Sequence, residues 1–220
     1  MWASPGPGAR IQNVAASLVG RPAFWVILVT AIGAWPLAWS HLHPLPPPQP
    51  VLGRVPEFEL VDEQGRTFGT KDLAGRVWVA GVVTGQAPDP SRTVARMAQI
   101  QDRARQLADR FHLVSLSADP EHDTPERLFA YARASHASPR MWSFLTGPTD
   151  AVRRAFVEAA GRRQLDPREM ARGSPMSMLA LVDVKGRIRA CYDAEASNVV
   201  DRVVRDAAVL VNRPEEADEP

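Results

Sequence analysis

The apolar stretch Val77-Trp78-Val79-Ala80-Gly81-Val82-Val83 is followed by the turn Thr84-Gly85-Gln86-Ala87-Pro88-Asp89-Pro90-Ser91 and then by an amphipathic segment that runs to Phe111. A nearly unbroken apolar run is typical of a strand buried on both faces in the middle of an α/β sheet. The segment after the turn predicts a long helix, because apolar residues recur in it every three or four positions. The turn itself lies where α/β sheets often carry their chemistry, at the carboxyl end of a central strand. It contains no Cys, His or Lys and no Gly-rich phosphate loop.

Length and composition limit the classes of protein to consider. The 220 residues suffice for one domain of ordinary size and an extension. A formal net charge of +1 provides no basic field, which argues against a nucleic-acid partner. The single cysteine, Cys191, excludes an intramolecular disulfide, a Cys-based zinc site and a dithiol redox pair within the chain.

The N-terminal part of the chain predicts a membrane anchor. Residues 22–40 carry no charge, and a helix of that length reaches roughly 28 Å, enough to cross a hydrocarbon core. Arg10 and Arg21 precede this segment, which favours a cytoplasmic segment at residues 1–21 and places the rest of the chain outside. The alternative is a cleaved signal peptide, but the apolar stretch is long for one and no clear small-x-small cleavage site follows it.

The next segment, residues 41–55, is rich in proline and predicts a semi-rigid spacer rather than a helix or a paired strand. His41 and His43 in it are metal ligands in one reading and interfacial polar residues in the other. Residues 56–212 form the expected folded domain, and residues 213–220 form an acidic tail that we expect to fray.

Strand and helix patterns alternate through this domain. They predict an α/β fold of the thioredoxin-like type with an added N-terminal β-hairpin. The expected elements after the central strand are strands at 113–117 and 141–145, helices beginning at Thr124 and near Val152, a polar loop at 161–173, a hairpin of 178–182 with 187–191, and a last helix at 199–211.

Asp119, His122 and Asp123 follow the second core strand and suggest two readings. Carboxylate and imidazole groups at this spacing are compatible with a metal site. Turn-forming and capping roles explain the same residues, since Thr124, Pro125 and Glu126 are typical of a helix start.

Four stretches of the domain are distinctive: Phe58 to Gly75 (FELVDEQGRTFGTKDLAG), Val114 to Tyr131 (VSLSADPEHDTPERLFAY), Trp142 to Gly147 (WSFLTG) and Leu181 to Gly186 (LVDVKG). In these stretches the domain resembles the SCO/SenC family, membrane-tethered thioredoxin-fold copper proteins involved in cytochrome oxidase assembly. The resemblance implies a domain from Pro56 to about Val211 on the periplasmic side of the inner membrane.

The family binds Cu(I) through a CxxxCP motif in the turn after the central strand and a His near the start of the penultimate strand, and such soft ligands suit this ion. In this chain the two cysteine positions fall on Gln86 and Pro90, and the histidine position falls on or beside Pro175. The resemblance therefore implies a scaffold from which all three copper ligands are missing, and the sequence predicts no cofactor.

Substitute copper ligands are the alternative. Met176 and Met178 stand beside the lost histidine position, and His41 or His43 could add an imidazole. Cys191 lies on a later strand, where an inert thiol or an intermolecular disulfide is expected.

The sequence predicts a membrane-anchored, non-enzymatic accessory or binding factor in cytochrome oxidase or copper-protein assembly. Its expected partners are the lipid bilayer and a respiratory oxidase subunit or another copper-handling protein, with no nucleic acid. A copper chaperone with Met and His ligands is the first alternative, and a thiol peroxidase or disulfide reductase is the second.

Overall fold

The computed structural model describes residues 50–83, 91–107, 109–154 and 177–212, together with the helical residues Pro22, Ala23, Trp25, Val26, Thr30, Gly33 and Trp35. The chain divides into two compact units, Met1–Pro46 and Pro47–Pro220. No helix within the described residues combines the length and the apolarity that crossing a bilayer requires. Most of the predicted anchor at 22–40 lies outside the described residues.

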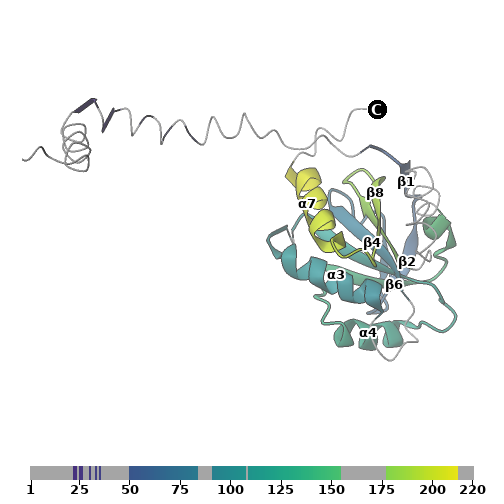
Figure 1. Cartoon of the computed structure of the whole chain (residues 1–220). Coiled ribbons are helices and arrows are strands. Elements are labelled where there is room, and N and C mark those ends of the chain that lie inside the picture. The colour runs from purple at the N-terminus through teal and green to yellow at the C-terminus, as the bar shows by residue number, and fades with distance from the viewer. Residues whose placement is uncertain are drawn as a thin grey trace, which may run out of the picture. The chain divides into compact units, whose positions relative to one another are not determined.

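The second unit is built on one mixed sheet. Its strands lie in the order β1-β8-β7-β4-β5-β6-β2-β3 (Figure 1). The strands are β1 (Gly53–Arg54), β2 (Glu59–Asp62), β3 (Thr67–Gly69), β4 (Val77–Val83), β5 (Phe111–Ser117), β6 (Trp142–Thr146), β7 (Met178–Val182) and β8 (Arg187–Asp193).

The predicted central strand is confirmed as β4. It pairs in parallel with β5 from Val77↔Phe111 to Val83↔Ser117, and antiparallel with β7 from Trp78↔Val182 to Gly81↔Leu179. All seven residues of β4 are buried. A strand with partners on both edges and cover on both faces has no side that can hold a charge, which explains its sequence.

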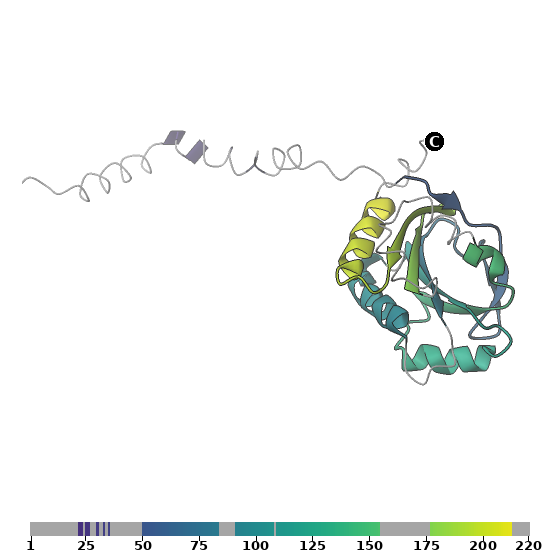
Figure 2. The same cartoon turned by 45° about the vertical axis from the view of Figure 1, so that its right-hand side comes forward.

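Alternate residues of β4 enter two separate apolar clusters. Val77, Val79 and Val83 belong to one cluster, while Trp78 and Ala80 belong to the other. Three helices contribute to the first cluster: α3 (Arg92–Arg103), α4 (Pro125–Ala134) and α7 (Val199–Asn212). Figures 1 and 2 show α3 and α7 side by side across the same face of the sheet.

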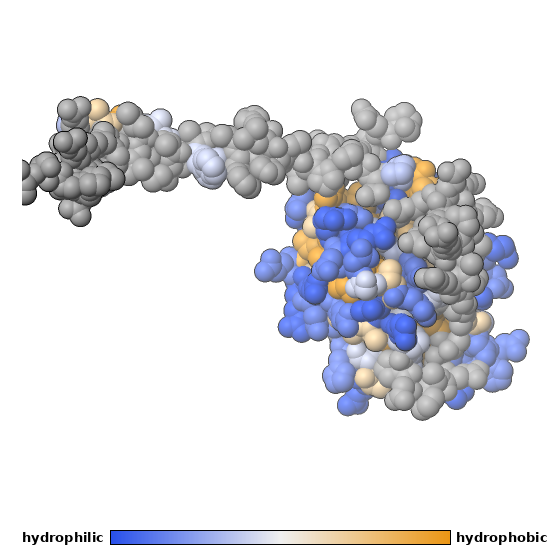
Figure 3. Space-filling view, viewed as in Figure 1, coloured by the Kyte–Doolittle hydropathy of each residue, from blue (hydrophilic) through white to orange (hydrophobic). Residues whose placement is uncertain are grey.

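The α3 region carries several arginines, and Figure 3 shows hydrophilic residues on this side of the domain. Three of these arginines tie the region to its neighbours. Arg96 donates to the Ala194 carbonyl (3.3 Å), Arg103 pairs with Asp201, and Arg110 donates to the Val211 carbonyl (3.1 Å).

The predicted helix to Phe111 is wrong at its end. The α-helix ends at Arg103, a short 3-10 helix (η1, Arg105–Leu107) follows, and Phe111 begins β5. Phe111 is fully buried in the same apolar cluster as Met97 and Ile100 of α3. The spacing of apolar residues in α3 therefore continues to Phe111, because the helix and the start of β5 bury these side chains in one cluster.

The predicted spacer at 41–55 also needs a correction at its end. Gly53 and Arg54 form β1, which pairs with Ile188 and Arg187 of β8, and Leu52 and Val55 on either side are buried. Residues 51–55 contain no proline, so each can offer its N–H to a strand. Leu52 N–H donates to the Ile188 carbonyl at 2.8 Å.

Two turns of the sheet repeat one arrangement. In the turn at 62–66, the Asp62 carboxylate accepts the backbone N–H groups of residues 64 and 66 (2.9 and 2.8 Å) and Arg66 Nε (2.9 Å). Asp183 accepts the equivalent bonds from residues 185 and 187 (2.9 and 3.0 Å) and from Arg187 Nε (2.8 Å). Both aspartates are 1 % exposed. The two predicted hairpins are thus confirmed, and each is closed by a buried carboxylate.

At Gly81, side chains of α3 and β7 lie directly against the central strand. A Cβ at this position would lie 2.8 Å from Met97 Sδ and 3.1 Å from Leu179 Cδ2. We predict that Gly81→Ala lowers the free energy of unfolding by about 1–3 kcal/mol, the usual cost of overpacking a core. Chemical denaturation of the full-length chain measures this change.

A double-mutant cycle supplies the control. In a Met97→Ala background the added methyl has room, so we expect Gly81→Ala to cost less there than in the wild type. An equal cost in both backgrounds would contradict the packing explanation.

Candidate functional site

The parallel strands β4, β5 and β6 end together at one edge of the sheet, at Val83, Ser117 and Thr146, and this is called the carboxyl edge below. The antiparallel strand β7 begins at the same edge, because Leu179 lies opposite Gly81. Consequently the turn after β4 and the segment before Met178 leave and reach the sheet next to each other. The sequence had placed the family's ligand positions on these two segments.

Both ends of the turn after β4 are held by hydrogen bonds. The Val83 carbonyl accepts the Ala118 N–H at 2.8 Å. Ser91 precedes α3 and caps it, with Oγ 3.4 Å from Val94 N, while its own N–H donates to the Tyr131 hydroxyl at 3.0 Å. Residues 84–90 between them lie outside the described residues. The described flanks place the turn between the end of a buried strand and the positive end of a helix dipole.

A buried polar network fixes the loop after β5. The Ser117 hydroxyl donates to Asp123 Oδ2 at 2.6 Å and accepts the Asp119 N–H at 3.0 Å. The Thr149 hydroxyl donates to the Ser117 carbonyl at 2.9 Å. Ser117 and Asp123 are 0 % exposed and Thr149 is 1 % exposed. Buried polar groups that are bonded to one another in this way hold a loop in a single arrangement.

Asp119 and His122 form a second, exposed pair at the same edge. His122 Nδ1 lies 2.9 Å from both carboxylate oxygens of Asp119, and 61 % of the His122 side chain is exposed. The hydrogen bond to Asp119, and then its negative charge, raise the pKa of His122 above its ordinary value. The ring is therefore more readily protonated than a free histidine, and the contact becomes an ion pair as the pH falls.

The loop forms a turn in which the Asp119 carbonyl accepts the N–H groups of His122 and Asp123 (3.2 and 2.9 Å). The Asp123 carboxylate accepts the Ser117 hydroxyl. Within the described residues, no three His, Cys, Asp or Glu side chains are arranged to hold a metal ion. Thr124 is the N-cap residue of α4, with Pro125 in the first turn, as predicted, but its hydroxyl makes no capping hydrogen bond to the helix backbone.

Most residues of the predicted copper site cannot be compared with the structure. Gln86, Pro90, Pro175, Met176, His41 and His43 all lie outside the described residues. Met178 is the described member of the substitute-ligand set. It begins β7 opposite Asp193, is half-buried and packs against the apolar cluster that contains Trp78 and Cys191. Met178 thus contributes to the core packing.

Cys191 lies opposite Ala180 in the β7–β8 pair and is 0 % exposed. Nucleophilic and redox-active cysteines occupy partly exposed, electropositive surroundings. This thiol instead lies inside an apolar cluster, which agrees with the expectation of an inert group. An intermolecular disulfide would require the sheet to open.

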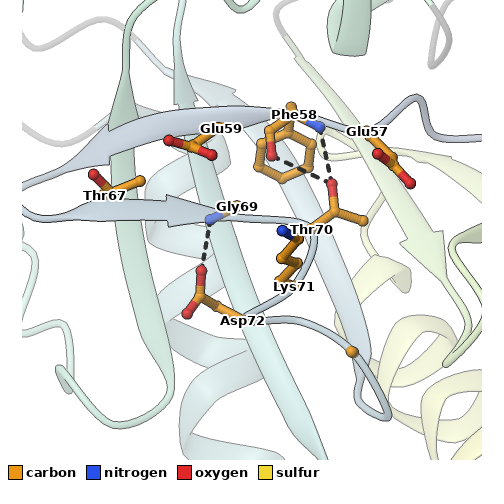
Figure 4. Close-up of a pocket in the computed structure, with 9 residues that line it drawn as sticks. Glu57, Phe58, Glu59, Thr67, Gly69, Thr70, Lys71 and Asp72 are labelled. Atoms are coloured by element: carbon orange, nitrogen blue, oxygen red, sulfur yellow. Dashed lines mark hydrogen bonds between the residues drawn. The ribbon is translucent and has the colours of Figure 1, made fainter.

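The hairpin of β2 and β3 borders a hollow of about 650 Å³ (Figure 4). Two of its polar side chains, Thr70 and Asp72, bond to the backbone of this region. Phe58 N donates to Thr70 Oγ1 at 2.9 Å, and Gly69 N donates to Asp72 Oδ2 at 2.8 Å. These two side chains therefore stabilise the hairpin region, and the hollow needs no ligand to account for them.

Sequence reasoning missed one polar site at the opposite end of the strands. His112 and Ser143 are the second residues of β5 and β6, and both are buried. The available signal was a histidine and a serine at the second position of two largely apolar strands.

The Asp119–His122 pair predicts a measurable pH effect. Asp119→Asn removes the main cause of the raised pKa, so we expect the His122 pKa to fall toward the ordinary value of about 6.5. Glu121→Gln is the matched control, because Glu121 raises this pKa less than Asp119 does. An NMR titration of the imidazole resonances measures both variants. A His122 pKa that Asp119→Asn leaves unchanged would contradict the assignment.

The SCO1/SenC family model matches residues 49–209. The SCO1 protein homolog of Bacillus subtilis is 24 % identical over 160 residues, which cover 71 % of this chain and 82 % of the homolog. One similar solved structure is that of BsSco, described as a member of the Sco family of cytochrome c oxidase assembly proteins in which a disulfide switch was identified. Its TM-score is 0.60 at 21 % identity, and the match covers 74 % of this chain and 97 % of the BsSco chain. Yeast Sco1 with copper bound has a TM-score of 0.51 at 21 % identity, covering 73 % and 94 %.

At these identities the structural similarities concern the fold, and they agree with the thioredoxin-like α/β fold built around β4. The family model spans the whole sheet, from before β1 into α7. The chain belongs to the SCO1/SenC family.

Proposed function

We propose that this chain is a membrane-anchored accessory or binding factor in the assembly of cytochrome c oxidase or of another copper protein, without copper-thiolate or disulfide chemistry of its own. One observation carries the proposal: the carboxyl edge keeps an ordered scaffold, while the chain has a single thiol, Cys191, inside the sheet core. The positions that correspond to the family's cysteines hold Gln86 and Pro90. An amide is a poor ligand for Cu(I), and proline offers no side-chain donor.

The assembly setting follows from the relatives. BsSco is described as a member of a family of cytochrome c oxidase assembly proteins, and yeast Sco1 binds copper in its crystal. Transferred to this chain, these properties suggest a partner that is a respiratory oxidase subunit or another copper-handling protein. The turn at 84–91 has two prolines, Pro88 and Pro90, and their restricted backbones suit a fixed recognition surface.

The membrane location rests on the uncharged segment at 22–40 and on Arg10 and Arg21 before it. In the proposed arrangement this segment anchors the chain in the inner membrane, the N-terminus is cytoplasmic, and the family domain lies on the periplasmic side.

The proposal predicts the outcome of complementation in cells that lack the gene. We expect these cells to have less cytochrome c oxidase activity in their membranes, and the wild-type chain to restore it. Cys191→Ala should restore it equally at the same protein level, because the proposed function needs no thiol. Cys191→Ala is a small change of volume, so the variant is expected to fold.

Two outcomes would count against the proposal. Normal oxidase activity without the gene would contradict the assembly role. A loss of complementation by a stably accumulated Cys191→Ala chain would contradict the absence of thiol chemistry.

A copper chaperone that uses Met and His ligands is the second candidate, favoured by the position of Met178 at the carboxyl edge, two residues after Met176 in the sequence. This candidate predicts that replacing both methionines by leucine abolishes Cu(I) uptake by the purified chain. Leucine keeps the volume and the apolar packing of Met178, so the test isolates the thioethers. Copper uptake that persists in the double variant would exclude this candidate.

A further inference from the structure

A hollow of about 390 Å³ lies at the amino ends of β5 and β6, at the end of these strands opposite the carboxyl edge. Its walls come from the β2–β3 hairpin, from the residue before β4 and from the loop before β6. The proposed assembly function makes no use of it.

The floor of the hollow is a histidine and serine pair. His112 Nε2 lies 3.0 Å from Ser143 Oγ, and the Phe68 ring stacks on the imidazole with centroids 5.7 Å apart. His112 is 3 % exposed, and its second ring nitrogen, Nδ1, is buried without a hydrogen-bond partner in the described part of the chain. A buried polar atom without a partner is costly, and a ligand that bonded to it would remove this cost.

The charges around the floor are mostly positive. Arg66, Arg76 and Arg140 line the hollow, against the two carboxylates of Asp62 and Asp72. Arg66 is already paired with Asp62, with NH2 2.8 Å from Oδ2. Asp72 accepts the Gly69 N–H at 2.8 Å (Figure 4).

The remaining cations, Arg76 and Arg140, are available for a ligand. Within the described residues, neither guanidinium makes a hydrogen bond or an ion pair. Arg76 is half-buried and Arg140 is exposed at the mouth. Guanidinium groups recognise oxyanions through planar, bidentate hydrogen bonds, and both of these line the same hollow.

The imidazole can serve as a neutral donor in this position. Burial, together with the nearby charge of Arg76, lowers the pKa of His112 to about 4. The ring is therefore neutral near pH 7 and carries one proton. When the Ser143 hydroxyl donates to Nε2, that proton is on Nδ1, which can donate to a ligand.

We propose that this hollow is a binding site for a small oxyanion, held between the guanidinium groups of Arg76 and Arg140 and accepting a hydrogen bond from His112 Nδ1. Phosphate, sulfate and small carboxylates share the required chemistry.

Calorimetric titration of the full-length chain with inorganic phosphate, sulfate and succinate, at constant ionic strength, tests the site. We expect saturable binding of at least one of the three. Arg76→Gln and Arg140→Gln should each raise the Kd about tenfold, since each removes a hydrogen bond to a charged group. Arg133→Gln, which removes the same charge from the exposed side of α4, should leave the Kd unchanged.

An NMR titration provides a second readout. A bound anion stabilises the imidazolium, so saturation with the binding anion should raise the His112 pKa from about 4. Binding of phosphate and sulfate alone would assign a tetrahedral ligand, and binding of succinate alone a carboxylate; both support the site. No saturable binding at millimolar concentrations, or a Kd that neither arginine variant changes, would overturn it.

Discussion

The burial of β4 between β5 and β7 is the constraint on which the rest of the domain depends. All seven residues of the strand are buried, and its register with both neighbours is continuous. This register brings the end of β4 and the start of β7 to the same edge. Gly81 allows α3 to lie against the strand, because any larger residue would contact Met97 and Leu179. The geometry of the carboxyl edge therefore follows from the ladder and the core, not from the residues of the turn.

The carboxyl edge is further held by hydrogen bonds between protein groups. Ser117 joins Asp123 and Thr149 in a buried network, and Ser91 joins α3 to Tyr131. These contacts supply order at the edge without a metal ion or a thiolate. The proposed function uses this scaffold, with its ligand residues exchanged, as a surface for a partner.

Much of the fold could be predicted from the sequence. The central strand β4, the two hairpins and the last helix, α7, were predicted from local patterns, and each is confirmed. The end of α3 was mispredicted because Phe111 continues the apolar period of the helix while it pairs with Val77 in the sheet. The strand β1 was missed because its two residues depend on pairing with β8, a contact that no local pattern encodes.

The candidate site could be predicted only in part. The helix start at Thr124 and Pro125 followed from residue types, although the Thr124 hydroxyl makes no capping hydrogen bond. The buried bond between Ser117 and Asp123 depends on tertiary packing. The hollow beneath Arg76 and Arg140 was not predictable either, since its residues come from distant parts of the chain that only the sheet brings together. The assignment of Gln86, Pro90 and Pro175 to the ligand positions stays a prediction.

The central claim is that the scaffold of the copper site remains while its chemistry is absent. Titration of the full-length chain with Cu(I) against a competing chelator tests it most directly, with Gln86→Cys/Pro90→Cys/Pro175→His as the matched variant. We expect no copper bound by the wild type and about one equivalent bound by the variant, since two thiolates and an imidazole suit Cu(I). Tight binding of about one equivalent by the wild-type chain would contradict the account.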